Sequence, residues 1–182
     1  EKFAIAINSR LKKSIVIKKA EEVDERFHSR LNCKRKTYRY IINNSPYGTA
    51  IYRYLETHIP QKLNVEKMKK AVKYFIGEHD FKAFKASGTS SKSSVRTIYD
   101  AKIYQNGDKI YIELTGNGFL YNMVRIIAGT LIRVGTGEYK PEQIPEILKQ
   151  KNKKRRYKEK SMEENEFKEK MQEKHFLQMV YI

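Results

Sequence analysis

A long apolar stretch between two glycines, Gly116 and Gly135, constrains the fold of this chain more than any other feature. It opens with Gly-Asn-Gly, which is a turn signal. Apolar residues then recur with the spacing of one helical face, at Leu120, Met123, Val124, Ile127, Leu131 and Val134. Phe119, Ile126 and Ala128 make much of the other side apolar as well. The stretch therefore predicts a helix that is buried on most of its surface.

Arg125 lies in the middle of this predicted helix. A guanidinium group keeps its proton in proteins, so its burial requires a carboxylate or phosphate partner. Two interpretations remain open at this point. Arg125 closes a structural ion pair in the core, or it serves a functional site.

The segment Lys34 to Ile42 alternates like a strand. One side carries Lys36, Tyr38 and Tyr40, and the other carries Thr37, Arg39 and Ile41. Cations and aromatic rings on one strand suit an RNA-facing surface, because they offer charge to phosphates and a ring face to a base. The alternative is a sheet edge that Lys and Arg protect against aggregation.

Other patterns predict the remaining secondary structure. A helix capped by Asn64 buries Met68, Ala71, Val72 and Phe75. Strands Val95 to Tyr104 and Lys109 to Leu114 form a hairpin around an Asn106-Gly107 turn. Further elements are expected as follows: a helix over Glu1 to Arg10, a short strand over Ser14 to Lys18, and a last helix over Pro141 to Lys149.

The chain is strongly basic, with 38 Lys+Arg against 21 Asp+Glu and a formal net charge of +17. The segment from Lys149 onward contributes +5, so +12 belongs to the rest of the chain. This favours a polyanion partner, and nucleic acid over a membrane, although a merely basic protein would show the same charge. No apolar run approaches the length of a membrane span. Cys33 is the only cysteine, which excludes a disulfide framework and predicts a cytoplasmic protein.

Three polar stretches carry further candidate chemistry. Glu78-His79-Asp80 suggests a metal or acid–base site, but without a second ligand cluster a hydrogen-bond network that fixes a loop is the better interpretation. The hydroxyl-rich loop Lys85 to Ser94 suits phosphate contacts and equally suits a mobile surface loop. His28 and Arg30, taken alone, are solvated loop residues.

Together, five short motifs resemble the bacterial tRNA pseudouridine synthase A family, in its order and at about its spacing, over residues 1 to about 149. They are Phe27-His28-Ser29-Arg30, Lys36-Thr37-Tyr38-Arg39-Tyr40, Gly77-Glu78-His79-Asp80-Phe81, Val95-Arg96-Thr97-Ile98 and Gly118-Phe119-Leu120-Tyr121-Asn122-Met123-Val124-Arg125. Each motif alone is weak, and five in register are specific.

The resemblance implies the C-terminal half of an α+β fold, with a mixed, largely antiparallel sheet and helices packed on one face. It also implies an enzyme that isomerises uridine to pseudouridine in the anticodon stem and loop of tRNA. Such enzymes use no metal or organic cofactor and act as homodimers. The expected partner is therefore tRNA.

The resemblance also assigns roles to residues. Tyr38 matches the active-site tyrosine that stacks on the target base, and Arg125 matches the arginine that pairs with the nucleophilic aspartate. Further substrate-binding residues are expected among His28, Arg30, Lys36, Arg96, Asn117 and Phe119.

The chain departs from the family in two places. The family's nucleophile lies in an Arg-Thr-Asp-x-Gly-Val-His-Ala run, which is absent here and would precede Glu1, so the chain alone is predicted to be inactive. A non-catalytic RNA-binding module is the alternative. Residues 150–182 form a divergent Lys/Glu-rich tail, separate from the catalytic portion 1–149. Read one base out of frame, codons for Met171 to Ile182 can encode a Thr-x-Pro-x-x-Gly-Leu run like the family's closing segment, which predicts a frameshift.

Overall fold

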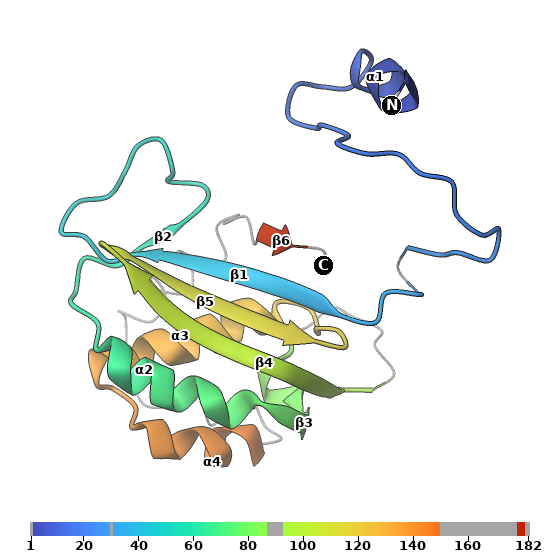
Figure 1. The fold of residues 1–182 in the computed structure, drawn as a ribbon. Helices are drawn as coiled ribbons and strands as arrows, with labels where there is room; N and C mark the ends of the chain where they lie inside the picture. Colours follow the sequence, from blue (N-terminus) through green and yellow to red (C-terminus); the bar gives the residue numbers. More distant parts are fainter. Residues whose placement is uncertain (1, 30, 87–92, 150–177, 181–182) are drawn as a thin grey trace. The chain divides into compact units, whose positions relative to one another are not determined.

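The computed structural model describes residues 2–29, 31–86, 93–149 and 178–180 (Figure 1). The chain divides into two compact units, Glu1–Cys33 and Lys34–Ile182. The sequence patterns did not predict this division. The boundary expected between residues 149 and 150 stays a prediction, because most of the tail lies outside the described residues.

The first unit contains helix α1 (Lys2–Asn8), as expected, followed by an irregular segment. The strand predicted over Ser14 to Lys18 is wrong, because these residues pair with no strand. The Asn8 side chain holds the segment instead: Nδ2 donates to the Ile17 carbonyl at 2.8 Å, and Oδ1 accepts from the Ile17 amide at 2.7 Å. β-branched residues favour a strand only where a ladder partner exists.

The second unit is built on one sheet, with strand order β2-β1-β5-β4-β3 and β6 also pairing with β1. The strands are β1 (Lys36–Asn43), β2 (Thr57–His58), β3 (Gly77–Asp80), β4 (Val95–Asn106), β5 (Lys109–Gly116) and β6 (Gln178–Val180). Only the β1–β2 pair is parallel among these pairings of the described strands. The mixed, largely antiparallel sheet is therefore confirmed.

The predicted hairpin is formed by β4 and β5. Its two-residue turn is Gly107-Asp108, one position later than expected, and Gly107 has a φ of 58° that favours glycine. Alternate residues of β5 face the core, where Ile110, Ile112 and Leu114 are fully buried.

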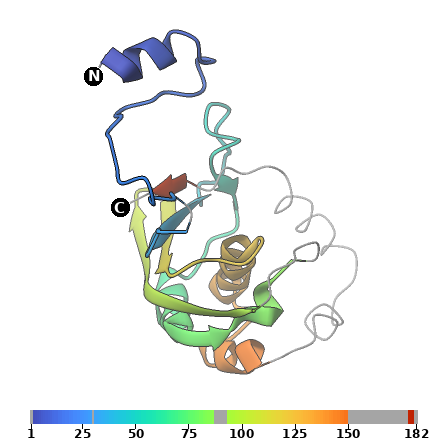
Figure 2. The same cartoon turned by 90° about the vertical axis from the view of Figure 1, so that its right-hand side faces the viewer.

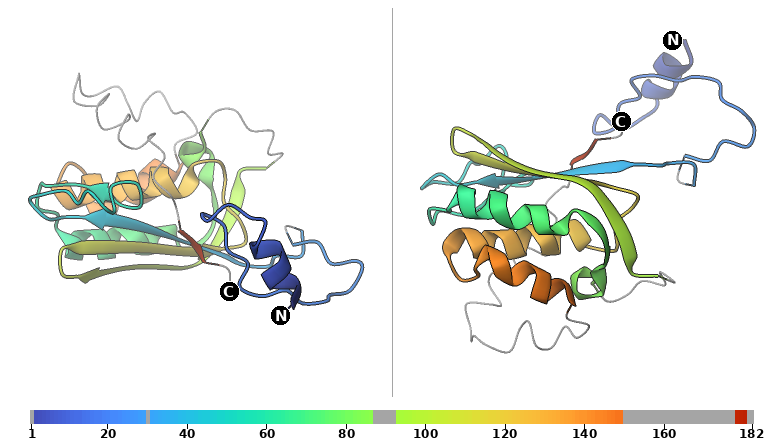
Figure 3. Two further views of the ribbon diagram at one scale, coloured as in Figure 1. Left: turned by 90° about the horizontal axis from the view of Figure 1, so that it is seen from above. Right: turned by 60° about the horizontal axis from the view of Figure 1, so that its bottom comes forward.

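Helices cover one face of this sheet, as expected (Figures 1 and 3). They are α2 (Val65–Val72), α3 (Met123–Thr136) and α4 (Ile144–Lys149), with single turns η1 (Lys73–Phe75), η2 (Phe81–Phe84) and η3 (Pro141–Gln143). Asn64 caps α2 through its side chain, which accepts from the Lys67 amide at 3.0 Å. The predicted stripe of α2 and η1 is buried.

Helix α3 is the buried helix that the sequence predicted, with ten of its 14 residues buried. It begins at Met123, later than the apolar spacing indicated. Leu120 is buried in the preceding loop. At the other end, Gly135 lies against α2, where an added Cβ would be 2.8 Å from Met68 Sδ. The glycine therefore permits the two helices to approach closely.

The tyrosines of β1 lie on the covered side of the sheet. Tyr40 and Ile42 are buried in the core, and Tyr38 lies on the same side because side chains alternate along a strand. Arg39 lies on the open side, where its Nε donates to Glu113 Oε1 at 2.6 Å. The tyrosines of the strand that was expected to face RNA are therefore not exposed on the open face of the sheet.

Strand β6 falls within the tail segment in which the frameshift was predicted, and it pairs with Thr37, Tyr38 and Arg39 of β1. The rest of that segment lies outside the described residues, so the frameshift stays a prediction. In the described parts of the chain, no helix is both long and apolar enough to cross a membrane.

Candidate active site

One end of the sheet brings together residues that are far apart in the sequence. Lys36 of β1 and Ile98 of β4 both pair with Gly116, the last residue of β5. The loop from Asn117 to Asn122 continues from this point into α3. The strand register therefore gathers the first residues of β1 and β4, the end of β5 and the start of α3 (Figure 2).

Asn117 fixes the path of this loop. Its amide donates to the Thr97 carbonyl at 3.0 Å, and its Oδ1 accepts from the Thr97 amide at 3.0 Å. Gly116 makes the contact possible, because a Cβ there would lie 2.7 Å from the Thr97 carbonyl oxygen. The observed contacts of Asn117 thus hold the loop against β4, and its predicted role in substrate binding stays a prediction.

Phe119 and Tyr38 meet edge to face, with ring centroids 5.2 Å apart and an interplanar angle of 90°. Both rings are partly buried and pack against the core. Such pairs prefer this geometry because the positive edge of one ring meets the negative face of the other. Phe119 therefore restricts the orientation of the Tyr38 ring.

Arg125 is in the first turn of α3 and is partly buried. Its Nη1 donates to Asn122 Oδ1 at 2.7 Å. Burial raises the pKa of Tyr40, and the nearby Arg125 charge acts in the opposite direction. Helix α3 packs against the covered face of the sheet, so Arg125 lies on the same side of the sheet as Tyr40 and Tyr38. An arrangement on opposite faces, which would exclude a shared site, is not observed.

Asn122 is the residue of this site that the sequence did not indicate. Its φ of 56° places it in the left-handed region, alone among the non-glycine residues that the structure describes. A helix N-cap is usually extended and bonds to the first helical amides. Here the side chain bonds to the guanidinium group of Arg125 instead. The sequence signal that could have identified Asn122 is its place in the family-like motif Gly118 to Arg125.

Arg96 and Lys36 supply the positive charge near this loop. Nη1 of Arg96 donates to the carbonyl oxygens of Val95 at 2.6 Å and Ser93 at 3.1 Å, and the side chain passes beside Gly118. Lys36 is partly exposed at the start of β1.

The structure does not test the remaining two predicted site residues. His28 belongs to the first unit, where its Nδ1 accepts from the Leu31 amide at 3.3 Å and its own amide donates to Asn32 Oδ1 at 2.6 Å. These contacts form a local turn. Arg30 lies outside the described residues. Both assignments stay predictions.

The hydrogen-bond network expected around His79 and Asp80 is confirmed, although the residues lie on strand β3. His79 Nε2 contacts the Ile76 carbonyl at 3.0 Å. Asp80 Oδ1 accepts from the Lys82 amide at 3.0 Å and from Ser94 Oγ at 2.5 Å. No group of three or more potential ligands suited to a metal ion occurs in the described ranges.

The loop Lys85 to Ser94 lies mostly outside the described residues. Its first part is attached to the site, because the Ala86 amide donates to the Tyr121 carbonyl at 3.0 Å.

Comparisons with known proteins match this chain to one family. A sequence model described as tRNA pseudouridine synthase matches residues 71–171. The chain is 54% identical to tRNA pseudouridine synthase A of Ruminiclostridium cellulolyticum, over 81% of this chain and 61% of that protein. It is 46% identical to the protein of the same name from Acetivibrio thermocellus, over 85% of this chain and 64% of that protein. It is 51% identical to tRNA pseudouridine synthase A of Thermoanaerobacter sp., over 84% of this chain and 62% of that protein.

The chain thus spans about three fifths of the length of the curated relatives that it matches. Identity of this level over most of the chain agrees with the family-like motifs found in the sequence. The chain belongs to the tRNA pseudouridine synthase family.

Proposed function

We propose that this chain forms one part of a tRNA pseudouridine synthase that isomerises uridine to pseudouridine in the anticodon arm of tRNA. The observation that carries the proposal is the site at the sheet end. Tyr38, Phe119 and Arg125 lie on the covered face of the sheet in a chain that belongs to this family.

The proposed roles follow from the chemistry. The target base must leave the stem before its glycosidic bond is accessible. The ring of Tyr38, oriented by Phe119, stacks on the flipped base. Arg125, oriented by Asn122, keeps the nucleophilic carboxylate ionised and in place. The bond between the sugar C1′ and uracil N1 breaks and a bond between C1′ and C5 forms. C5 loses its proton to solvent and N1 gains one, so that the product is an isomer of the substrate.

The carboxylate itself comes from outside these 182 residues in this proposal. The chain holds no Arg-Thr-Asp-x-Gly-Val-His-Ala run, and about two fifths of each matched relative has no counterpart in it. The chain alone therefore binds tRNA but forms no pseudouridine. Residues 1–149 act as the catalytic portion and 150–182 as a divergent tail. A homodimer, a cytoplasmic location and catalysis without a metal or organic cofactor are further expectations from the resemblance.

Positive charge governs RNA binding in this proposal. Lys36, Arg96 and Arg30 of this chain, whose net charge is +17, contact phosphates and release the counterions condensed on the RNA into solution. With these three phosphate contacts, affinity falls by roughly 40-fold between roughly 50 and 200 mM salt. A titration of tRNA at several salt concentrations measures this slope, and an affinity independent of salt would refute the RNA-binding proposal.

Catalysis is tested with tRNA that carries tritium at uridine C5, because each turnover releases one tritium to water. The chain alone should release none. A chimera that adds the unmatched part of the Ruminiclostridium cellulolyticum relative should release it, and Arg125→Ala in the chimera should abolish the release. Release by the chain alone would contradict the assigned nucleophile. Salt-dependent binding without release by the chimera would favour the non-catalytic RNA-binding module, whose supporting observation is the absent aspartate motif.

A further inference from the structure

The loop between β1 and β2 forms an exposed aromatic surface at the far end of the sheet. Every residue from Pro46 to Leu55 is exposed. The exposed fractions of Tyr47, Ile51 and Tyr54 are 84%, 84% and 61%. Figure 1 shows this loop at the opposite end of the sheet from the start of β1, where Tyr38 lies. Large exposed apolar groups concentrated on one loop mark an interaction surface.

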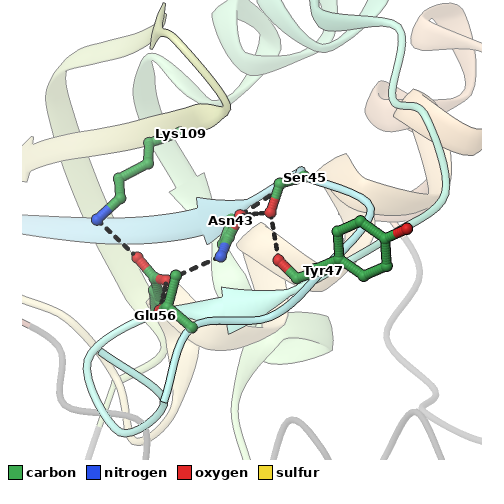
Figure 4. Close-up of polar contacts among 6 residues, drawn as sticks. Asn43, Ser45, Tyr47, Glu56 and Lys109 are labelled. Atoms are coloured by element: carbon green, nitrogen blue, oxygen red, sulfur yellow. Dashed lines mark hydrogen bonds and ion pairs between the residues drawn. The ribbon is translucent and has the colours of Figure 1, made fainter. Parts of the chain in front are cut away.

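A buried carboxylate holds the base of this loop (Figure 4). The Glu56 side chain is 3% exposed and its Oε2 lies 3.0 Å from Lys109 Nζ. Its Oε1 accepts from Asn43 Nδ2 at 3.0 Å and from Thr49 Oγ1 at 2.6 Å. Ser45 joins the network, because its hydroxyl donates to Asn43 Oδ1 at 2.6 Å.

These contacts fix both ends of the loop. Asn43 and Ser45 precede the exposed segment, Thr49 lies within it, and Glu56 follows it. The Leu55 and Glu56 amides also donate to the Tyr52 carbonyl at 2.8 and 3.1 Å. A loop ordered in advance loses less conformational entropy when a partner binds.

The exposed surface of this loop carries three tyrosine rings and one cation, Arg53, but no acid. The segment from Pro46 to Leu55 contains no Asp or Glu. The Arg53 guanidinium lies over the Tyr54 ring at 4.5 Å, and Lys109 Nζ lies over the Tyr52 ring at 4.2 Å. Glu56 is already neutralised by Lys109. A polyanion with flat aromatic groups is complementary to such a surface.

We propose that the loop Pro46 to Leu55 is a second RNA contact, at which Tyr47 and Tyr54 stack on unpaired bases of the tRNA and Arg53 contacts a phosphate. Every base offers a ring face, so such stacking requires no particular sequence. The same loop of a second copy fits less well, because the contact would bring two Arg53 side chains together with no acid from either loop. The inference rests on the proposed function, in that it requires the chain to bind tRNA.

The contact lies away from the reacting nucleotide. Five residue steps along β1 separate Tyr38 from Asn43, which corresponds to about 17 Å at the strand rise, and the loop extends beyond Asn43. The RNA that reaches the loop therefore lies several nucleotides from the reacting uridine.

The test measures dissociation constants of the 182-residue chain for an unmodified tRNA transcript and for a blunt RNA duplex without unpaired bases. Tyr47→Ala and Tyr54→Ala should each raise the constant for the tRNA by roughly tenfold, the effect of one stacked base. Binding to the duplex should change by less than about twofold. Tyr74→Ala is the matched control, because it removes an exposed tyrosine from η1 in the helix layer.

Each result decides the matter. Unchanged tRNA affinity in both loop variants would overturn the inference while leaving the proposed function intact. An equal loss for tRNA and duplex would overturn the role of unpaired bases. If wild type sediments as a dimer and both loop variants as monomers, the loop is a protein interface and the inference is wrong. Failure of the wild-type chain to bind tRNA would refute the proposed function together with the inference.

Discussion

Replacing Glu56 by alanine should destabilise the second unit more than any loop substitution at its surface. The change leaves the buried amide of Asn43 without its acceptor and removes the partner of Thr49 and Lys109. A hydrogen bond to a charged group contributes about 1.5–3 kcal/mol. Lys109 is 33% exposed, so water solvates its ammonium group once Glu56 is removed. Loss of the ion pair therefore adds little to the destabilisation. We expect the free energy of unfolding to fall by about 2–4 kcal/mol.

Glu56→Gln separates charge from hydrogen bonding. Glutamine keeps an acceptor oxygen for Asn43 or Thr49, so the expected loss is about 1–2 kcal/mol. Burial alone would raise the pKa of Glu56, but hydrogen bonds from Thr49, Lys109 and Asn43 together lower it below its ordinary value. The stabilisation that the ionised Glu56 carboxylate provides is therefore fully present above the unfolded pKa of about 4.3. It is lost as the pH falls through the folded pKa.

The assay is urea unfolding of wild type and both variants, followed by circular dichroism between pH 7 and pH 3. The difference between wild type and Glu56→Gln should shrink toward acid pH. Glu66→Ala is the control, since the Glu66 side chain is 76% exposed in its pair with Lys69 and should contribute at most about 1 kcal/mol. A loss below about 0.5 kcal/mol for Glu56→Ala, or a difference for Glu56→Gln that does not change with pH, would refute the reasoning.

Three further predictions follow from the packing and from the tail. Gly135→Ala should destabilise the fold by about 1–3 kcal/mol, because its Cβ would overlap Met68; a stable variant in thermal melting would show that α2 moves aside. Asn122→Gly should keep stability but slow tritium release by the chimera, because Arg125 loses the acceptor that orients it, whereas Asn122→Ala should also lose about 1 kcal/mol from left-handed strain; equal release by all three chimeras would contradict the role given to Asn122. Sequencing the gene under Met171 to Ile182 should reveal a Thr-x-Pro-x-x-Gly-Leu run in the shifted frame, and its absence would make the tail a true divergence.

The sequence by itself determined the elements whose pattern is local. The stripe of α2, the alternation of β5 and the buried face of α3 were all predicted, because periods of 3.6 and 2 residues assign side chains to one face. The family motifs also named Tyr38 and Arg125 from sequence, and the structure places both on one face of the sheet.

Only the tertiary structure decided features that depend on distant partners. Ser14 to Lys18 forms no strand, because no ladder partner lies beside it. Helix α3 starts at Met123 rather than at Leu120, where the apolar spacing begins, and the preceding Phe119 ring packs against Tyr38. The Glu56 network joins residues from β1, its following loop and β5, which no local pattern connects. Hydrophobic periodicity specifies which side of an element is buried, but a buried charge is stable only where the whole fold assembles its donors around it.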